Sequence, residues 1–306
     1  MSFNEKSYKG HVLMVLAYTI FGLNIPAVKS IIGVAGITAL SVTFYRMAGA
    51  AVLFWIASIF TRREKVPLRD IGVMFIASLF CIFLNQLPFI VGVSLTSPID
   101  AGVVTTTGPM LTMVLAAVFL REPITWLKAG GVAVGAAGAL LLIMGAGAAA
   151  GRGGASIEGD LLCVASCLSF AIYLTAFKRL ITAYSPVTLM KWMFLFAAVL
   201  SFPVCWGDVA AVDYASLGWE VWARIGFIVG GATFLTFFLL PVGQRFLRPT
   251  VLSMYNYLQP TVAALVAVAA GMDTFGATKG LATLLVFAGV WIVTRSKSRA
   301  QIEQSR

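Results

Sequence analysis

The sequence predicts an all-α integral membrane protein in which ten transmembrane helices form two inverted five-helix repeats around a central cavity. Composition is the first reason: of 306 residues, 60% are hydrophobic and only 11% are charged, and the mean hydropathy is +0.94. A soluble domain carries about a quarter charged residues, so we expect lipid around this chain. An internal repeat and the placement of the basic residues are the second and third reasons.

Residues 98–142 recur 151 positions later without a gap. Each copy begins an apolar segment with a proline and has a second proline eleven residues on, then a carboxylate, a lysine six residues beyond it and a glycine. The matched pairs are Pro98 and Pro249, Pro109 and Pro260, Glu122 and Asp273, Lys128 and Lys279, and Gly138 and Gly289. Because such self-similarity marks a duplicated unit, we predict one repeat over residues 1–150 and a second, with a basic C-terminal tail, over residues 151–306.

A helix needs about 20 predominantly apolar residues to cross the hydrocarbon, and ten segments of the chain meet this requirement. They are residues 11–32, 38–60, 70–93, 98–120, 124–145, 158–181, 186–207, 217–244, 249–270 and 276–295. Strands are excluded because open strand edges cannot face lipid and because the alternation that a barrel needs is missing. Residues 146–157, rich in Gly and Ala, are expected to link two halves of five helices each.

Five helices per repeat is an odd number, so the two copies must enter the membrane from opposite sides. The basic residues agree with this expectation. Of 22 Lys and Arg residues, seventeen fall on the side of the N-terminus, four fall on the other side, and Arg46 lies within a span. The positive-inside rule then predicts a multi-pass protein of the bacterial inner membrane with both termini in the cytoplasm.

Several stretches resemble a known family. They are Phe21-Gly22-Leu23-Asn24 with Lys29, Arg46-Met47-Ala48, Gly108-Pro109 through Leu120-Arg121-Glu122-Pro123, and Gln259-Pro260 through Asp273. The pattern is similar to the ten-helix EamA-type permeases of the drug/metabolite transporter superfamily, over nearly the whole chain. Arg121 departs from the glycine usual in that family, and Asp273 departs from the glutamate. The resemblance implies a carrier similar to bacterial exporters of amino acids, with aromatic or neutral hydrophobic ones preferred.

The ionisable residues argue against an enzyme, a metal site or a cofactor. All twelve carboxylates lie in tails, loops or helix ends, and the one histidine, His11, starts the first helix. No Ser/His/Asp set, metal-ligand cluster or phosphate-binding glycine loop is visible, and the four cysteines fall in apolar spans as expected of small buried residues. The missing midmembrane relay favours uniport or exchange over proton coupling. The net charge of +10 is explained by membrane orientation rather than by nucleic-acid binding.

Polar side chains within the spans are the candidate substrate-binding residues, because such groups are costly in hydrocarbon. Prolines 26, 88, 109 and 260 interrupt the same helices, as is typical of a midplane site formed by broken helices. The candidates are Asn24, Arg46, Asn85, Gln86, Thr106, Tyr173, Gln244, Tyr255, Asn256 and Gln259. Trp192 is added because the family resemblance implies that its span lies around the cavity.

Alternatives stay open for several of these candidates. A membrane threonine can bond its own backbone, and Gln244 can be interfacial. Arg46 is either an anchor for a substrate carboxylate or a structural partner of helix-end carbonyls or of Asp100.

These observations predict a secondary transporter that moves a small metabolite by alternating access, and the family resemblance implies that this metabolite is a neutral or aromatic amino acid moved outward. Drug-like compounds, nucleotide sugars and a channel-like facilitator are the alternatives. The expected partners are a small-molecule substrate and the lipid bilayer. Helices 124–145 and 276–295 are expected outside the transport route, and glycines at 130, 131, 135 and 138 suit close helix packing. We therefore expect a monomer, or a weak dimer through those two helices.

Overall fold

The structure is a computed structural model, and it describes residues 3–95, 104–105, 107–150, 157–259, 261–262 and 277–296. The regular structure of these residues is helical throughout. The predicted fold class is confirmed: the protein is an all-α membrane protein whose two halves are inverted five-helix repeats. The spans 98–120 and 249–270 are described only in part, and Thr106, Pro260 and Asp273 lie outside the described residues.

The first half follows the predicted order of spans. It contains α1 (Phe3–Lys29), η1 (Val34–Gly36), α2 (Ala39–Ile59), α3 (Leu68–Ser78), η2 (Leu79–Phe83), α4 (Leu84–Leu95), α6 (Thr107–Leu120) and α7 (Trp126–Ala150). Helix α2 begins with a capping box, in which the Thr38 hydroxyl accepts from Ser41 N while the Ser41 hydroxyl accepts from Thr38 N. After α6, Arg121 has a φ of 51°. This left-handed conformation favours glycine, which explains why glycine is usual at this position in the family. Arg121 adopts the same conformation without that freedom.

The second half repeats the arrangement. It contains α8 (Ile157–Ala176), α9 (Lys178–Ala183), α10 (Pro186–Ala210), η3 (Tyr214–Ser216), α11 (Trp219–Gly226), η4 (Phe227–Leu235), α12 (Thr236–Phe246), α13 (Pro249–Ser253), η5 (Met254–Tyr257) and α15 (Ala277–Arg295). Ser185 caps α10 by accepting from Thr188 N, and Pro186 occupies the first turn, where its missing N–H leaves no bond unmade.

Five of the described helical segments are long and apolar enough to cross a membrane. These are Ala39–Ile59, Leu68–Gly92, Ile157–Ala176, Pro186–Ala210 and Trp219–Phe246. Two of them are composite, because a π-helical segment, η2 or η4, interrupts the third helix of each half. A π-helical turn shifts the register of the backbone hydrogen bonds and is frequent at functional sites.

The packing of the helices is symmetric when the two halves are exchanged. The first helix of each half packs on the third helix of the other half: α1 packs on α12, and α8 packs on α4. The second helix of each half does the same, since α2 packs on η4, and α10 packs on η2 and α3. The pairs α2 with α10, α6 with α13 and α7 with α15 join equivalent helices of the two halves. The bundle is therefore built from contacts between the repeats, related by a pseudo-two-fold axis.

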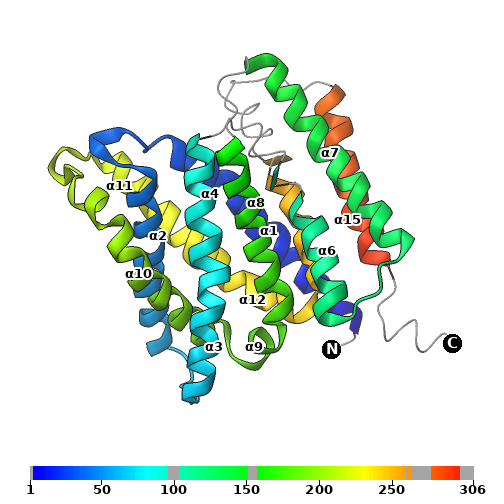
Figure 1. Cartoon of the computed structure of the whole chain (residues 1–306), viewed down its shortest axis with the longest axis horizontal. Helices are drawn as coiled ribbons and strands as arrows, with labels where there is room; N and C mark the ends of the chain where they lie inside the picture. Colours follow the sequence, from blue (N-terminus) through cyan, green and yellow to red (C-terminus); the bar gives the residue numbers. More distant parts are fainter. Residues whose placement is uncertain are drawn as a thin grey trace.

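Each end of the bundle corresponds to one predicted side of the membrane. In Figure 1, α1 begins and α15 ends at the same end, where the start of α3 and helix α9 also lie. We call this the basic end, because loop 60–67 with Arg62, Arg63 and Lys65 lies there. At the other end a separate apolar cluster, with Ile31, Val42 and Val212 among its members, packs the ends of the helices together.

Glycines allow α7 and α15 to approach closely at one side of the bundle (Figure 1). A Cβ atom on Gly289 would lie 2.6 Å from Gly135 N, and one on Gly131 would lie 2.7 Å from Val293 Cγ2 and 2.9 Å from Val293 N. The buried face of the α7 glycines is thus already in contact with α15 of the same chain. Gly130 lies on the exposed side with nothing within 4 Å of its Cβ position. A dimer through these helices stays a prediction, and it would have to use their outer faces.

Gly131→Leu is expected to destabilise the protein by about 1–3 kcal/mol, because the added side chain must displace the backbone of α15. The measurement is the apparent Tm in detergent. Gly130→Leu, one residue away and open to lipid, is the control and should leave the Tm unchanged or higher, since glycine is a poor helix former. Equal Tm values for the two variants would contradict the close α7–α15 packing.

Candidate functional site

A cavity of about 130 Å³ lies between the two halves. Its lining comes from α1, α2, α4, α6, α8, α12 and η5, together with Thr105 before α6 and Gln259 after η5. The lining residues are Tyr18, Phe21, Asn24, Arg46, Asn85, Gln86, Phe89, Thr105, Gly108, Thr112, Ser166, Cys167, Phe170, Phe237, Leu240, Asn256 and Gln259. Among the described residues, α7, α10 and α15 contribute none of these side chains. The lining groups are neutral polar and aromatic, apart from one arginine.

Arg46 is the charged residue of this cavity, and it is 6% exposed. Its Nε donates a hydrogen bond of 3.0 Å to Thr233 Oγ1, and Thr233 Oγ1 donates in turn to Ile228 O at 2.7 Å. Both partners belong to the π-helical segment η4 of the opposite repeat. The ion pairs of the described residues are Lys128–Glu122 and Arg224–Glu220, and Arg46 belongs to neither. Asp100, the alternative partner considered from the sequence, lies outside the described residues.

Three other lining residues have buried polar atoms without a hydrogen-bond partner in the described part of the chain. These are the Asn24 Oδ1 atom, both amide atoms of Gln86, and the Tyr18 hydroxyl. An unpartnered buried polar atom destabilises a structure by about 1–3 kcal/mol. Where such atoms converge on a cavity that also holds an arginine with no ion pair among the described residues, they suit a polar ligand that supplies the missing bonds.

Asn85 is committed to a structural role. Its Nδ2 donates to Ser166 O at 3.2 Å and to Ser166 Oγ at 3.1 Å, while Ser166 Oγ donates back to Asn85 O at 2.7 Å. These bonds join α4 of the first half to α8 of the second. Asn85 therefore lines the cavity and at the same time closes the contact between two helices.

Six of the eleven predicted site residues thus line the cavity: Asn24, Arg46, Asn85, Gln86, Asn256 and Gln259. Thr106 lies outside the described residues, although its neighbour Thr105 is in the lining. The other four have different surroundings. Tyr173 is 1% exposed and packs against Phe170 and Phe177, and Trp192 packs edge-on against Trp55 at 5.4 Å. Gln244 is 2% exposed, and Tyr255 is 4% exposed and stacks on the lining residue Tyr18.

Aromatic and small residues are the part of the lining that the sequence reasoning missed. Tyr18 and Phe21 precede Asn24 by six and three residues, and Thr112 follows Gly108 by four. Spacings of three and four residues place side chains on one helix face, so Asn24 could have indicated Phe21 and Gly108 could have indicated Thr112. A spacing of six, as between Tyr18 and Asn24, gives no such indication. Two lining residues of helix α8, Ser166 and Phe170, were also overlooked, although they are four residues apart and so share a helix face.

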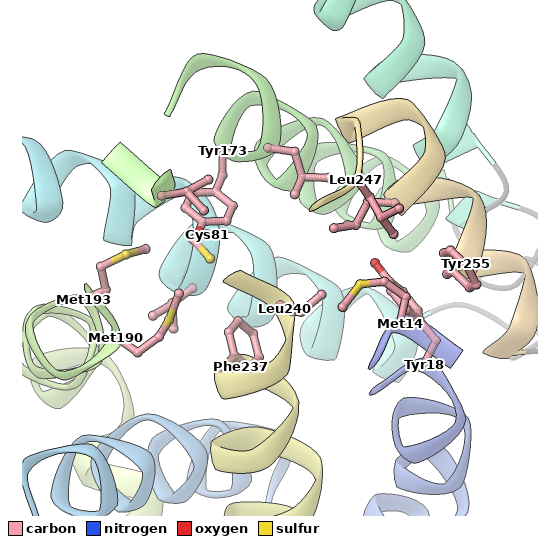
Figure 2. Packing of buried hydrophobic residues seen from close by; sticks show 14 of the residues in the cluster. Met14, Tyr18, Cys81, Tyr173, Met190, Met193, Phe237, Leu240, Leu247 and Tyr255 are labelled. Atoms are coloured by element: carbon pink, nitrogen blue, oxygen red, sulfur yellow. The ribbon is translucent and has the colours of Figure 1, made fainter. Parts of the chain in front are cut away.

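Bulky apolar side chains separate the cavity from the basic end. Figure 2 shows Phe237 and Leu240 of α12 among this packing, with Met190 and Met193 of α10 to one side. Tyr18, at the cavity, stacks on Tyr255 with ring centroids 6.2 Å apart, and the Tyr255 hydroxyl lies 2.5 Å from His11 Nδ1.

Polar contacts between the halves close the basic end itself. Glu64 accepts from Ser185 N at 3.0 Å and from Ser185 Oγ at 2.8 Å, and Asp70 accepts from the Tyr184 hydroxyl. Arg245 donates to Tyr184 O. We call this set, Glu64, Asp70, Tyr184, Ser185 and Arg245, the latch. Its bonds join the start of the third helix of the first half to the loop before α10.

The protonation states of the latch match these bonds. Desolvation opposes ionisation of Glu64, but bonds from Thr188 and Ser185 and the charge of Arg245 leave its pKa below the usual value. The hydrogen bond to Asp70, with a smaller effect of burial, raises the pKa of Tyr184 to about 12. At neutral pH Glu64 is therefore an acceptor and Tyr184 a donor.

A bundle of membrane-spanning helices in two inverted repeats, with a polar cavity between them, is typical of secondary transporters. The model of the EamA-like transporter family matches residues 8–144 and again residues 157–295. The chain belongs to this family, and hence to the drug/metabolite transporter superfamily, which confirms the family and the transporter class predicted from the sequence.

Similar proteins agree on the class. An uncharacterized transporter of Archaeoglobus fulgidus is 27% identical over 230 residues, which cover 75% of this chain and 77% of the relative. The uncharacterized transporters YetK and YyaM of Bacillus subtilis are 21% and 23% identical and cover 96% and 94% of this chain, and 89% and 97% of their own lengths. A solved crystal structure shares the fold, with a TM-score of 0.74 at 19% identity over the whole of both chains.

Asn85→Ala is expected to lower stability by about 1–3 kcal/mol, because it removes the two bonds that Asn85 Nδ2 donates to Ser166, while the bond from Ser166 Oγ to the backbone oxygen of residue 85 remains. Thermal unfolding in detergent measures this loss. Gln86→Met is the matched comparison at the next position: it removes an unpartnered amide and should leave the Tm unchanged or raised. A larger loss for Gln86→Met than for Asn85→Ala would contradict these assignments.

Proposed function

We propose that this protein carries amino acids, with neutral and aromatic ones preferred, outward across the bacterial inner membrane by alternating access. In this arrangement both termini and the basic end face the cytoplasm, as the excess of basic residues there requires. The observation that carries the proposal is the buried Arg46, which has no ion pair among the described residues, at a cavity where Asn24 Oδ1, the Gln86 amide and the Tyr18 hydroxyl have no hydrogen-bond partner in that part of the chain.

A zwitterion matches this set of groups. The Arg46 guanidinium offers its remaining N–H donors to a carboxylate, a charge-assisted contact of the strong kind. The amides of Asn24 and Gln86 offer oxygens to an ammonium group, which has three donors and no acceptor. Around these groups lie Phe21, Phe89, Phe170 and Phe237, which suit an apolar or aromatic side chain.

Size and charge favour this substrate class over the alternatives. A cavity of about 150 Å³ holds one benzene-sized molecule, and the cavity of about 130 Å³ here is close to that scale, so it suits a small metabolite. An aromatic amino acid is larger than benzene, and its binding requires the cavity to widen. A nucleotide sugar is far larger, and its two phosphates would call for more than one cation. A lipophilic cation would call for a carboxylate, and the lining drawn from the described residues has none.

Alternating access is supported by the contacts that hold the two halves together at the basic end. The latch and the apolar packing beneath Tyr18 close the basic end, so transport requires that the contacts between the halves break there. The π-helical segments η2 and η4 lie within the two third helices and give each a place where the backbone bonding can shift. A channel would not need a closed end, and counterflow separates it from a carrier.

The test is uptake into proteoliposomes loaded with unlabelled amino acid, using a panel of labelled amino acids with and without a pH gradient. We expect saturable uptake that internal substrate accelerates, strongest for aromatic and neutral side chains and little changed by the gradient. Uptake without exchange acceleration would contradict the carrier, and a strong response to the gradient would contradict uncoupled transport.

Arg46→Gln should lower the affinity for amino acids by about thirtyfold or more, because removing one partner of a buried charge pair costs about 2 kcal/mol at least. Arg46→Lys should recover little, because a point charge cannot replace a planar bidentate donor. Arg224→Gln, which removes an equal charge from an exposed arginine 44% accessible to solvent, is the control for counterflow. Unchanged affinity in Arg46→Gln would remove the substrate anchor.

Tyr184→Phe should open the basic end, because it deletes the bond to Asp70, and a bond to a charged group contributes about 1.5–3 kcal/mol. The measurement is labelling of Cys167, which lines the cavity, by an impermeant thiol reagent added at the basic end of a variant whose other cysteines are serine. We expect labelling about tenfold faster than with Tyr184 intact. Thr182→Val, which removes a hydroxyl that bonds only its own helix, is the control.

A further inference from the structure

A second hollow lies on the outside of the bundle, away from the cavity. It is a groove of about 620 Å³ between α2 and α10, and it reaches loop 60–67 at the basic end. Its walls change character along their length. Toward the middle of the membrane they are apolar, with Val52, Ile56 and Leu195, and at the basic end they are charged, with Arg63, Glu64 and Lys191.

The apolar part of the groove faces outward. Val52 is 59% exposed, Ile56 is 48% exposed and Ile59, where α2 ends, is 77% exposed. In a membrane-spanning helix such side chains face acyl chains. Trp55 lies in the same wall and is 38% exposed, and tryptophan is enriched at the level where hydrocarbon meets headgroups.

The charged part of the groove carries an excess of positive charge. Neither Arg63 nor Lys191 belongs to an ion pair among the described residues. Lys191 Nζ lies 5.0 Å from the centroid of the Trp55 ring, so its charge is held over the groove wall. Glu64 is the one acidic lining residue, and its carboxylate is already engaged by Ser185 N and Ser185 Oγ. Two cations therefore remain for a ligand.

We propose that this groove is a binding site for an anionic phospholipid of the leaflet at the basic end. The headgroup phosphate lies between Arg63 and Lys191, the Trp55 ring lies at the headgroup boundary, and an acyl chain follows Val52 and Ile56. A basic pocket beside transmembrane helices on the cytoplasmic side is the setting in which anionic headgroups bind. The site goes beyond the proposed transport function and shares with it only the orientation of the chain.

A second copy of the chain fits the groove less well than a lipid. A two-fold dimer brings the same patch of both subunits together, so Arg63 and Lys191 of one copy would approach those of the other. Like charges repel at such an interface, whereas a phosphate neutralises both cations. The gradient from apolar wall to cationic end also follows the shape of a phospholipid.

The experiment is native mass spectrometry of the full-length protein in detergent, with phosphatidylglycerol or phosphatidylcholine added at equal concentrations. We expect the wild-type protein to retain phosphatidylglycerol in preference to phosphatidylcholine. Arg63→Gln with Lys191→Gln should weaken the retention of phosphatidylglycerol by about thirtyfold, the factor that two basic residues contribute near an anionic surface.

The control removes the same charge from the same loop. Arg62 and Lys65 are exposed and do not line the groove, so Arg62→Gln with Lys65→Gln should retain phosphatidylglycerol as the wild type does. Equal loss in both double variants would reduce the effect to general surface charge and overturn the site. Equal retention of the two lipids by the wild-type protein, or a dimer that forms in place of lipid binding, would also overturn it. None of these outcomes bears on transport, which this experiment does not measure.

Discussion

The constraint that governs this structure is the absence of water in the hydrocarbon, where each polar group needs a partner inside the protein. Arg46 shows its effect most clearly. A cation in a transmembrane helix is unfavourable by several kcal/mol, and here it is held by one bond from Nε to Thr233 of the opposite repeat. The remaining donors are left at a cavity. The same constraint explains why Asn85 and Ser166 bond each other across two helices.

The two repeats share their architecture but divide the work. Each has a third helix interrupted by a π-helical segment, and each packs that helix against the other half. The arginine of the cavity comes from the first half, however, and the threonine that holds it comes from the second. The carboxylates of the latch likewise come from the first half and the hydroxyls that bond them from the second. Binding and closure thus both depend on contact between the halves.

The succession of the spans was predictable because hydrophobic length is a local property. The predicted span 38–60 corresponds to α2 at Ala39–Ile59, and 186–207 corresponds to α10 at Pro186–Ala210. The division of the third and eighth spans by η2 and η4 was not predictable, because a π-helical turn leaves no mark on hydrophobicity. For the site, polarity within a span identified Asn24, Arg46 and Gln86. Trp192 was chosen from the place of its span in the family rather than from polarity, and in the structure it packs on Trp55.

The sequence by itself determined the solvent, the number of crossings, the duplication and its inversion, because these depend on composition, length and charge along one dimension. Only the tertiary structure decided which face of each helix meets the cavity, and so separated Gln86, with its unpartnered amide, from the adjacent Asn85, which joins two helices. Neighbours in sequence point about 100° apart on a helix, and their surroundings depend on helices far away in the chain. That dependence is why one amide is free for a ligand while the next one is not.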